Sequence, residues 1–247
     1  MILYGELAPW FHLLTAPDEY AGEAARYQEL ALAACPDAAT LLELGSGGGN
    51  NGSHLKRRFT CTLADLSPAM LELSETINPE CEHLVGDMRS VRLDRLFDIV
   101  FVQDAIMYLT TEDELARCAE TAFIHTRPGG VTVIAPDCTS EGYRPEASHG
   151  GHDAADGRGL RYLEWSHPLE PGLTVARVDY AVLLREADGS ARVVHDAQSF
   201  GLFPERTWLR ILEQAGFIVA VDPGDPDDED RAQPVFVARR PLVDPLP

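Results

Sequence analysis

Along the first 140 residues the apolar positions follow two alternating spacings. Short runs that are almost wholly apolar, such as 40–44 and 97–102, are typical of strands buried on both faces of a parallel sheet. Between these runs apolar side chains recur every three or four residues, as at Tyr27, Leu30 and Ala34, which is typical of amphipathic helices. This alternation predicts an α/β fold whose sheet is parallel and whose crossovers are right-handed.

The pattern defines individual elements in this part of the chain. We expect strands at 40–45, 59–65, 81–87, 97–105 and 131–137, and helices at 21–34, 67–77 and 111–126. The last of these helices has the strongest start signal, because Thr111 and Glu114 form a capping box. The segment RPGG at 127–130 predicts a turn that ends the helix.

After Asp137 the pattern becomes that of an antiparallel sheet. Residues 139–159 are rich in Gly, His and acids and predict a long loop. Extended runs follow at 161–167, 173–186 and 191–203, the last two joined by the hairpin signal Asp188-Gly189. A helix at 204–216 and strands at 217–221 and 234–240 then return to the first pattern. We therefore expect an antiparallel β insertion after the fifth strand of an α/β core.

The segment 41–50, LLELGSGGGN, carries the first strand into a glycine-rich turn of the kind that cradles a ligand. A triphosphate-binding loop needs a lysine and a hydroxyl after its last glycine, but Asn50 and Asn51 follow here. A dinucleotide fingerprint needs G-x-G-x-x-G, and the third glycine, Gly49, comes one position early. Glu43, at the end of the strand, would repel a pyrophosphate and attract an ammonium group. We therefore expect a ligand that carries positive charge above this turn.

Two further acids end the second and third strands. Asp65 lies twenty residues after Gly45, where an acidic side chain usually accepts the two hydroxyls of a ribose. Asp87 follows Gly86, in a position to accept a hydrogen bond from an adenine amino group. Because the carboxyl ends of parallel strands meet at one edge of a sheet, these acids and the glycine turn predict a crevice for a nucleoside joined to an amino acid.

With these motifs the sequence resembles the class I S-adenosyl-L-methionine-dependent methyltransferases. The resemblance rests on ELGSGGG (43–49), LADLSPAML (63–71), GDMRSV (86–91), FDIVFVQDAIMYL (97–109) and RPGGVTVIAPD (127–137). It implies a Rossmann-like, doubly wound, seven-stranded and mostly parallel sheet with a reversed final hairpin. It also implies S-adenosyl-L-methionine as the cofactor over the carboxyl ends of the strands. It also implies an enzyme, a transferase that moves a methyl group in line to nitrogen or oxygen of a small-molecule acceptor.

The resemblance further implies which residues contact the cofactor. Glu43 organises the glycine turn and its ammonium partner, Asp65 takes the ribose hydroxyls, and Asp87 holds the adenine edge. The glycines Gly45, Gly47 and Gly49 admit the methionine moiety. The remaining expected contacts are Ser46 in the turn, Leu66 and Met88 on the adenine, Gln103 beside the methionine part, and Phe11 over the sulfonium.

Methyl transfer from a sulfonium depends on alignment and a dry pocket, so no catalytic triad is required. The segment 4–14, YGELAPWFHLL, resembles the lid of small-molecule members of the family, with Tyr4 over the sulfonium. Tyr108 is a candidate to accept or orient a proton. His149 and His152 have the chemistry of a general base or a metal ligand. Further ligands are not evident nearby, so we expect no metal site, and a mobile loop that brings one histidine to the acceptor.

Three parts of one overall domain follow from the resemblance. Residues 1–138 hold the N-terminal lid helices and the cofactor-binding core, 139–203 the loop and substrate-cap insertion, and 204–247 the closing helix and strands. The antiparallel insertion resembles that of small-molecule N-methyltransferases. We expect it to roof the acceptor pocket and regard it as a candidate homodimer contact.

Composition narrows the partners. The net charge of −20 argues against nucleic-acid binding, because phosphate backbones are bound by basic patches, and it permits an amine or hydroxyl acceptor. Part of this charge lies in DPGDPDDED (222–230), whose spacing does not match a calcium loop and predicts a solvated loop. The five cysteines form no C-x-x-C pair, which predicts free thiols. We find no membrane span and no signal peptide, and expect a cytoplasmic protein.

The sequence leaves two other functions open. A methyltransferase-like protein could bind the cofactor without transferring its methyl group, because no residue here is uniquely catalytic. A nicotinamide-dependent oxidoreductase is the less favoured alternative, since the G-x-G-x-G spacing and Glu43 both count against it.

Overall fold

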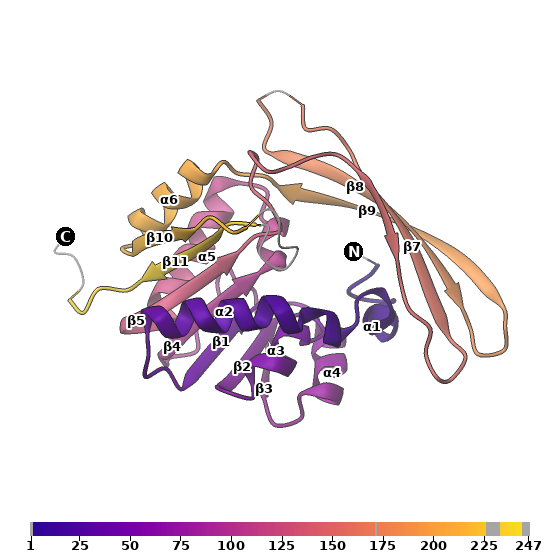
Figure 1. Cartoon of the computed structure of the whole chain (residues 1–247), viewed down its shortest axis with the longest axis horizontal. Coiled ribbons are helices and arrows are strands. Elements are labelled where there is room, and N and C mark those ends of the chain that lie inside the picture. Colours follow the sequence, from indigo (N-terminus) through magenta and orange to yellow (C-terminus); the bar gives the residue numbers. More distant parts are fainter. Residues whose placement is uncertain (1, 171, 226–232, 244–247) are drawn as a thin grey trace.

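The larger part of the structure is a seven-stranded sheet covered by helices on both faces (Figure 1). The structure is a computed structural model that describes residues 2–170, 172–225 and 233–243. The strands of the sheet are β1 (Thr40–Leu44), β2 (Thr60–Asp65), β3 (Glu82–Val85), β4 (Phe97–Gln103), β5 (Thr126–Ala135), β10 (Ile218–Asp222) and β11 (Val235–Arg239). Most of the acidic segment 222–230 lies outside the described residues, so the solvated loop expected there stays a prediction.

The strand order is β10-β11-β5-β4-β1-β2-β3, with β1 to β5 parallel. Strand β11 is antiparallel to both of its neighbours, which is the reversed final hairpin expected from the sequence. The strand order reverses at β1: β2 and β3 are added on one side of it, and β4 and β5 on the other. The loops after β1 and β4 therefore diverge and open a crevice at the carboxyl ends of these two strands. The predicted fold class is confirmed.

Helices cover the two faces of the sheet because successive side chains of the strands point in opposite directions. Leu41 packs in the cluster that contains Tyr27 and Leu55, whereas Leu42 packs in the cluster that contains Leu115 and Trp208. The helices are η1 (Ala8–Trp10), α1 (Phe11–Leu14), η2 (Pro17–Tyr20), α2 (Ala21–Ala34), α3 (Asn50–Leu55), α4 (Pro68–Ile77), η3 (Asp104–Tyr108), α5 (Glu112–His125) and α6 (Glu205–Gln214). Helices α2 and α3 thus lie on one face, and α5 and α6 on the other. Among the described residues, no helix is both long enough and apolar enough to cross a membrane.

A second sheet, in the order β6-β7-β8-β9, is antiparallel throughout. Its strands are β6 (Ala147–Gly150), β7 (Gly159–Ser166), β8 (Val175–Arg185) and β9 (Ala191–Gly201). It extends well beyond the core, and the N-terminal segment lies against it (Figure 1). There Leu3 and Trp10 pack with Leu160 and Val182, and the Ile2 amide donates to Asp196 Oδ2 at 3.0 Å. The insertion follows β5 as predicted, while the domain boundaries near 138 and 203 stay predictions.

Two local expectations were wrong. The segment 139–159 is not a continuous loop, because it contains β6, whose hydrogen bonds come from β7 and leave no signal in its own short sequence. The segment 127–130 is not a separate turn, because β5 begins at Thr126 directly after α5. The residues RPGG form an irregular part of β5. There the register with β4 shifts between Phe97 and Ile99, and Gly129 has φ 78°.

Candidate functional site

The glycine turn between β1 and α3 forms the floor of a cavity of about 660 Å³. Gly45, Gly47 and Gly49 all have positive φ, of 77°, 52° and 76°. A Cβ at Gly45 would lie 2.5 Å from the Cβ of Ala105, so the turn after β1 and the segment after β4 approach closely only because this residue is glycine. The volume is within the range of small-molecule sites.

Asp65, at the end of β2, fixes this turn. Its Oδ2 accepts a 2.8 Å hydrogen bond from the Gly47 amide, and its Oδ1 accepts one of 2.8 Å from the Ser67 amide. Burial raises the pKa of Asp65, against these two amide hydrogen bonds, which lower it. The carboxylate lines the cavity, where it can also accept a hydrogen bond from a ligand hydroxyl.

Glu43 lies beneath the turn, and its side chain is 4% exposed. Its Oε2 has no hydrogen-bond partner among the described residues, although it lines the cavity. Burial, with the charges of neighbouring acids, raises the pKa of Glu43 to about 8. A buried carboxyl in this condition is stabilised by a cation that enters the cavity. The Oγ of Ser46, also buried and lining the cavity, has no described partner either.

The side chains expected around an adenosine group lie along one side of the same cavity. Leu66 is 65% exposed and Met88 is partly buried, and both line the cavity. Asp87 lines it too, but Arg89 binds its carboxylate through Nε and Nη2, which lowers the pKa of Asp87. Arg89 also donates to Glu114 at 2.6 Å. The cation of Arg89 is therefore already shared between two protein carboxylates.

A chain of hydroxyl groups crosses the other side of the cavity. The hydroxyls of Tyr4 and Tyr108 are 2.6 Å apart, and Tyr108 donates to Gln198 Oε1 at 2.7 Å. Burial raises the pKa of both tyrosines, so they are neutral donors and acceptors at ordinary pH. Phe11 lies beside Tyr4, with ring centroids 5.8 Å apart, and against Gly48. The lid expected from the sequence thus brings Tyr4 and Phe11 to the cavity.

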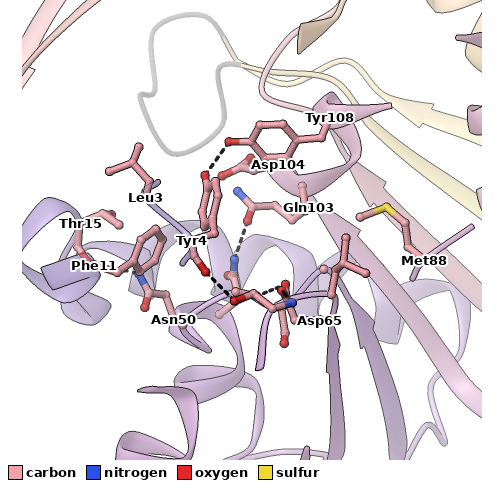
Figure 2. Close-up of a pocket in the computed structure, with 18 of the residues that line it drawn as sticks. Leu3, Tyr4, Phe11, Thr15, Asn50, Asp65, Met88, Gln103, Asp104 and Tyr108 are labelled. Atoms are coloured by element: carbon pink, nitrogen blue, oxygen red, sulfur yellow. Dashed lines mark hydrogen bonds between the residues drawn. The ribbon is translucent and has the colours of Figure 1, made fainter. Parts of the chain in front are cut away.

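Gln103 and Asp104 lie where β4 ends. Asp104 lies beside Tyr108, and Asp65 lies on the opposite side of the cavity (Figure 2). The Asn51 amide donates to Gln103 Oε1 at 3.0 Å. Asp104 has φ 31°, which is rare for a residue with a side chain. Burial and the adjoining carboxyl of Asp137, to which it is hydrogen bonded, raise the pKa of Asp104 well above its usual value.

The two candidate histidines lie outside this cavity. His149 is exposed on β6, opposite Leu163. His152 Nε2 lies 3.0 Å from Glu19 Oε1, in a pair that is open to solvent. A catalytic role for either one requires the segment 139–159 to move, and it stays a prediction.

Several cavity residues were not identified from the sequence. From the antiparallel sheet these are Tyr162, Glu164, Tyr180 and Phe200. Glu164 and Tyr180 are cross-strand partners in the antiparallel pair of β7 and β8. The alternation of side chains along these strands predicted that they are extended. It did not indicate which face of the antiparallel sheet lies against the core. Asp137 ends the segment 127–137 that carries part of the family resemblance, but the sequence did not predict that it lies beside Asp104.

Residues 41–130 match the family model described as a methyltransferase domain. A dTDP-3-amino-3,4,6-trideoxy-α-D-glucopyranose N,N-dimethyltransferase of Streptomyces venezuelae is 31% identical over 179 residues, 72% of this chain and 68% of that protein. A dTDP-3-amino-3,6-dideoxy-α-D-glucopyranose N,N-dimethyltransferase of Streptomyces fradiae is 29% identical over 90% of this chain and 88% of that protein.

Solved structures agree with these sequence relatives. DesVI of Streptomyces venezuelae superposes with a TM-score of 0.82 at 25% identity, over 96% of this chain and 97% of its own. S-adenosylmethionine-bound CalS10, an amino pentose methyltransferase from Micromonospora echinaspora, superposes with a TM-score of 0.75 at 27% identity, over 90% and 91%. The fold, the glycine turn and the acids at the strand ends are what such a cofactor requires. This chain therefore belongs to the class I S-adenosyl-L-methionine-dependent methyltransferases and methylates a small molecule.

Proposed function

We propose that the chain N-methylates an amine of a small polar acceptor in the class of amino sugars. The observation that carries this proposal is the acidic wall of the cavity, formed by Asp104, Asp137 and Glu164. Carboxylates attract an ammonium group, and the aromatic rings of Tyr4 and Tyr108 nearby favour a methylated cation through their faces. The amino-sugar N,N-dimethyltransferases among the relatives support the same acceptor class.

We propose that the cofactor lies across the carboxyl ends of β1, β2 and β4. Glu43 would bind its ammonium group, Asp65 its ribose hydroxyls, and Asp87 the adenine edge. The remaining proposed contacts are Gly45, Ser46, Gly47 and Gly49 in the turn, Leu66 and Met88 at the adenine, and Gln103 and Phe11 at the methionine part. The bound cofactor supplies a methyl group on a sulfonium, whose C–S bond breaks with its electron pair left on sulfur. The protein excludes water and aligns the acceptor.

The charge of the cavity also bears on whether the acceptor is a free sugar or one linked to a nucleoside diphosphate. Arg89 is the single Lys or Arg among the described lining residues, and Asp87 and Glu114 already bind it. A diphosphate needs cationic partners that are free to bind it. This lining favours a free amine over the dTDP-linked acceptors named for the relatives.

A methyl-transfer assay with matched acceptors tests the proposal. Glucosamine, glucose and a dTDP-linked 3-amino sugar are each incubated with the enzyme and S-adenosylmethionine, and products are detected by mass spectrometry. We expect methylated glucosamine, no product from glucose, and no gain from the nucleotide. Transfer to hydroxyl groups alone would refute N-methylation, and transfer only to the dTDP-linked sugar would refute the free acceptor.

A homodimer stays a further proposal. The outer face of the antiparallel sheet exposes the apolar side chains of Leu163, Trp165, Leu183 and Val193. Sedimentation of the wild-type protein and of Trp165→Glu tests it, since a dimer through this face would be weakened by the buried charge.

A further inference from the structure

Two carboxyl groups of the acidic wall form a pair at the ends of adjacent strands. Asp104 directly follows β4, and Asp137 comes two residues after β5. Gln103 and Ala135 are partners in the parallel ladder between these strands. The two carboxyls are hydrogen bonded to each other, and both line the cavity. Carboxyls in such contact hold one proton between them, because two negative charges at this distance repel each other strongly.

Among the described residues, no cation is one of the groups with the largest effects on Asp104. The charged groups that act on Asp104 are Asp137 and Glu23, both acidic. The described titratable groups around the pair come from every element packed against it: Glu23 and Tyr27 in α2, Tyr20 in η2, Tyr4 in the N-terminal segment, Tyr108 in η3, Cys138 beside Asp137, Glu164 in β7 and Tyr180 in β8. All of these are neutral or negative, and a cationic ligand would balance the charge of the pair.

A buried side chain next to the pair independently indicates a ligand. Asn51 is 2% exposed and lines the cavity, and its Oδ1 has no hydrogen-bond partner among the described residues. Its Nδ2 donates to Gln103 Oε1 at 3.0 Å, and Gln103 directly precedes Asp104 in the chain. A buried amide oxygen without a partner is costly, and a donor group from a ligand would satisfy it.

We propose that Asp104 and Asp137 act together as the base that takes a proton from the acceptor ammonium before methyl transfer. This inference rests on the N-methylation proposed above and adds the residues that perform its proton transfer. It differs from the histidine mechanism expected from the sequence, because the pair lines the cavity while His152 lies outside it.

The proton transfer balances without any further reactant. An alkyl ammonium at neutral pH has no free electron pair on nitrogen, because an ordinary amine has a pKa near 10. As the ammonium binds, it displaces the shared proton of the pair to water, which leaves both carboxyls ionised. One N–H bond of the ammonium then breaks, its electron pair stays on nitrogen, and the proton moves to a carboxylate oxygen of the pair. The neutral amine can then form the new N–C bond, and the product leaves a pair that again holds one proton. The raised pKa of Asp104 gives the pair a proton affinity suited to this exchange.

A titration that does not depend on turnover tests the pair directly. Protein carrying ¹³C-carboxyl aspartate is followed by NMR from pH 4 to 9 with S-adenosylhomocysteine bound. We expect a resonance, absent in Asp104→Asn, with a midpoint far above that of an ordinary aspartate. The midpoint should fall by about one pH unit or more in Asp137→Asn and on adding glucosamine, but not glucose. Independent titration of both carboxyls at ordinary pH would overturn the proposal.

The pH dependence of transfer supplies a second test. With an amine that the wild type methylates, Asp104→Asn and Asp137→Asn should lower kcat/KM at pH 7 by about a hundredfold or more. The loss should shrink towards pH 10, where the amine is neutral without help. Asp94→Asn is the matched control, because Asp94 is exposed and also has positive φ, 53°. Asparagine tolerates that backbone, so folding is preserved in each variant.

The two proposals can fail separately. If amines are methylated and the variants keep the wild-type pH profile, the pair is not the base, while N-methylation stands. If only hydroxyl acceptors react, N-methylation fails, and the paired base for an ammonium fails with it. If the wild type methylates none of the acceptors, the NMR titration still decides whether the two carboxyls share a proton that an ammonium displaces.

Discussion

Glu43 makes the unliganded protein sensitive to pH, and Glu43→Gln should remove that sensitivity. The carboxyl is buried, and its pKa in the folded protein is about 8 against a reference value of 4.5. Between these two values the folded state binds a proton that the unfolded state has lost. Stability therefore falls as pH rises through this window, by about 1.4 kcal/mol for each pH unit.

The size of the effect follows from the window. From pH 5 to pH 8 the carboxyl alone should lower the free energy of unfolding by about 4 kcal/mol. Glutamine has nearly the same shape and does not titrate, so the variant lacks this loss. Other buried acids contribute equally to both proteins. The stability of Glu43→Gln relative to wild type should thus grow by about 4 kcal/mol over this range.

Urea unfolding of the cofactor-free proteins at pH 5, 6, 7 and 8 measures this difference. Glu75→Gln, an exposed substitution on α4, is the control and should follow the wild type. Calorimetry with S-adenosylmethionine in buffers of different ionisation enthalpy gives a linked readout. At pH 7 the wild type should release about one proton as the ammonium group ionises Glu43, and the variant none. A stability difference that stays constant within about 1 kcal/mol would refute the reasoning.

Four further substitutions have defined outcomes. Gly49→Ala should cost roughly 2–4 kcal/mol in urea unfolding, because φ is 76° and the new Cβ would lie 2.1 Å from Ser74 Oγ. Gly189→Ala, at φ 86° in open space, should cost about 1 kcal/mol. Asp65→Asn should weaken cofactor binding roughly 10- to 100-fold by calorimetry, through lost charge-assisted hydrogen bonds. A catalytic role for His152 requires about a hundredfold slower turnover in His152→Ala at unchanged cofactor affinity, and unchanged turnover excludes it.

The sequence was most informative where a residue's role depends on its neighbours in the chain. The glycines after β1 and the acids that end β2 and β3 sit at fixed offsets from their own strands, so their meeting at one sheet edge follows from parallel topology. Family membership, together with Glu43, also decides against the nicotinamide alternative.

Residues whose role depends on distant partners were beyond prediction. Glu164 faces the cavity because of its register with Tyr180, and β6 exists because β7 supplies its hydrogen bonds. The pairing of Asp104 with Asp137 depends on how far each loop turns after its strand. The Gly-, His- and acid-rich segment 139–159 gives no local sign of β6, and the residues around Asp104 and Asp137 give no local sign of their pairing. Only the assembled structure shows these arrangements.

The four side chains that the antiparallel sheet contributes to the cavity all come from its inner face: Tyr162, Glu164, Tyr180 and Phe200. None of them is among the contacts proposed for the methyl donor. This part of the acceptor side is thus encoded apart from the proposed donor contacts, whereas Asp104 and Asp137 lie in the core stretch that also carries Gln103. A new acceptor specificity can be selected by randomising these four positions while the donor apparatus is inherited unchanged.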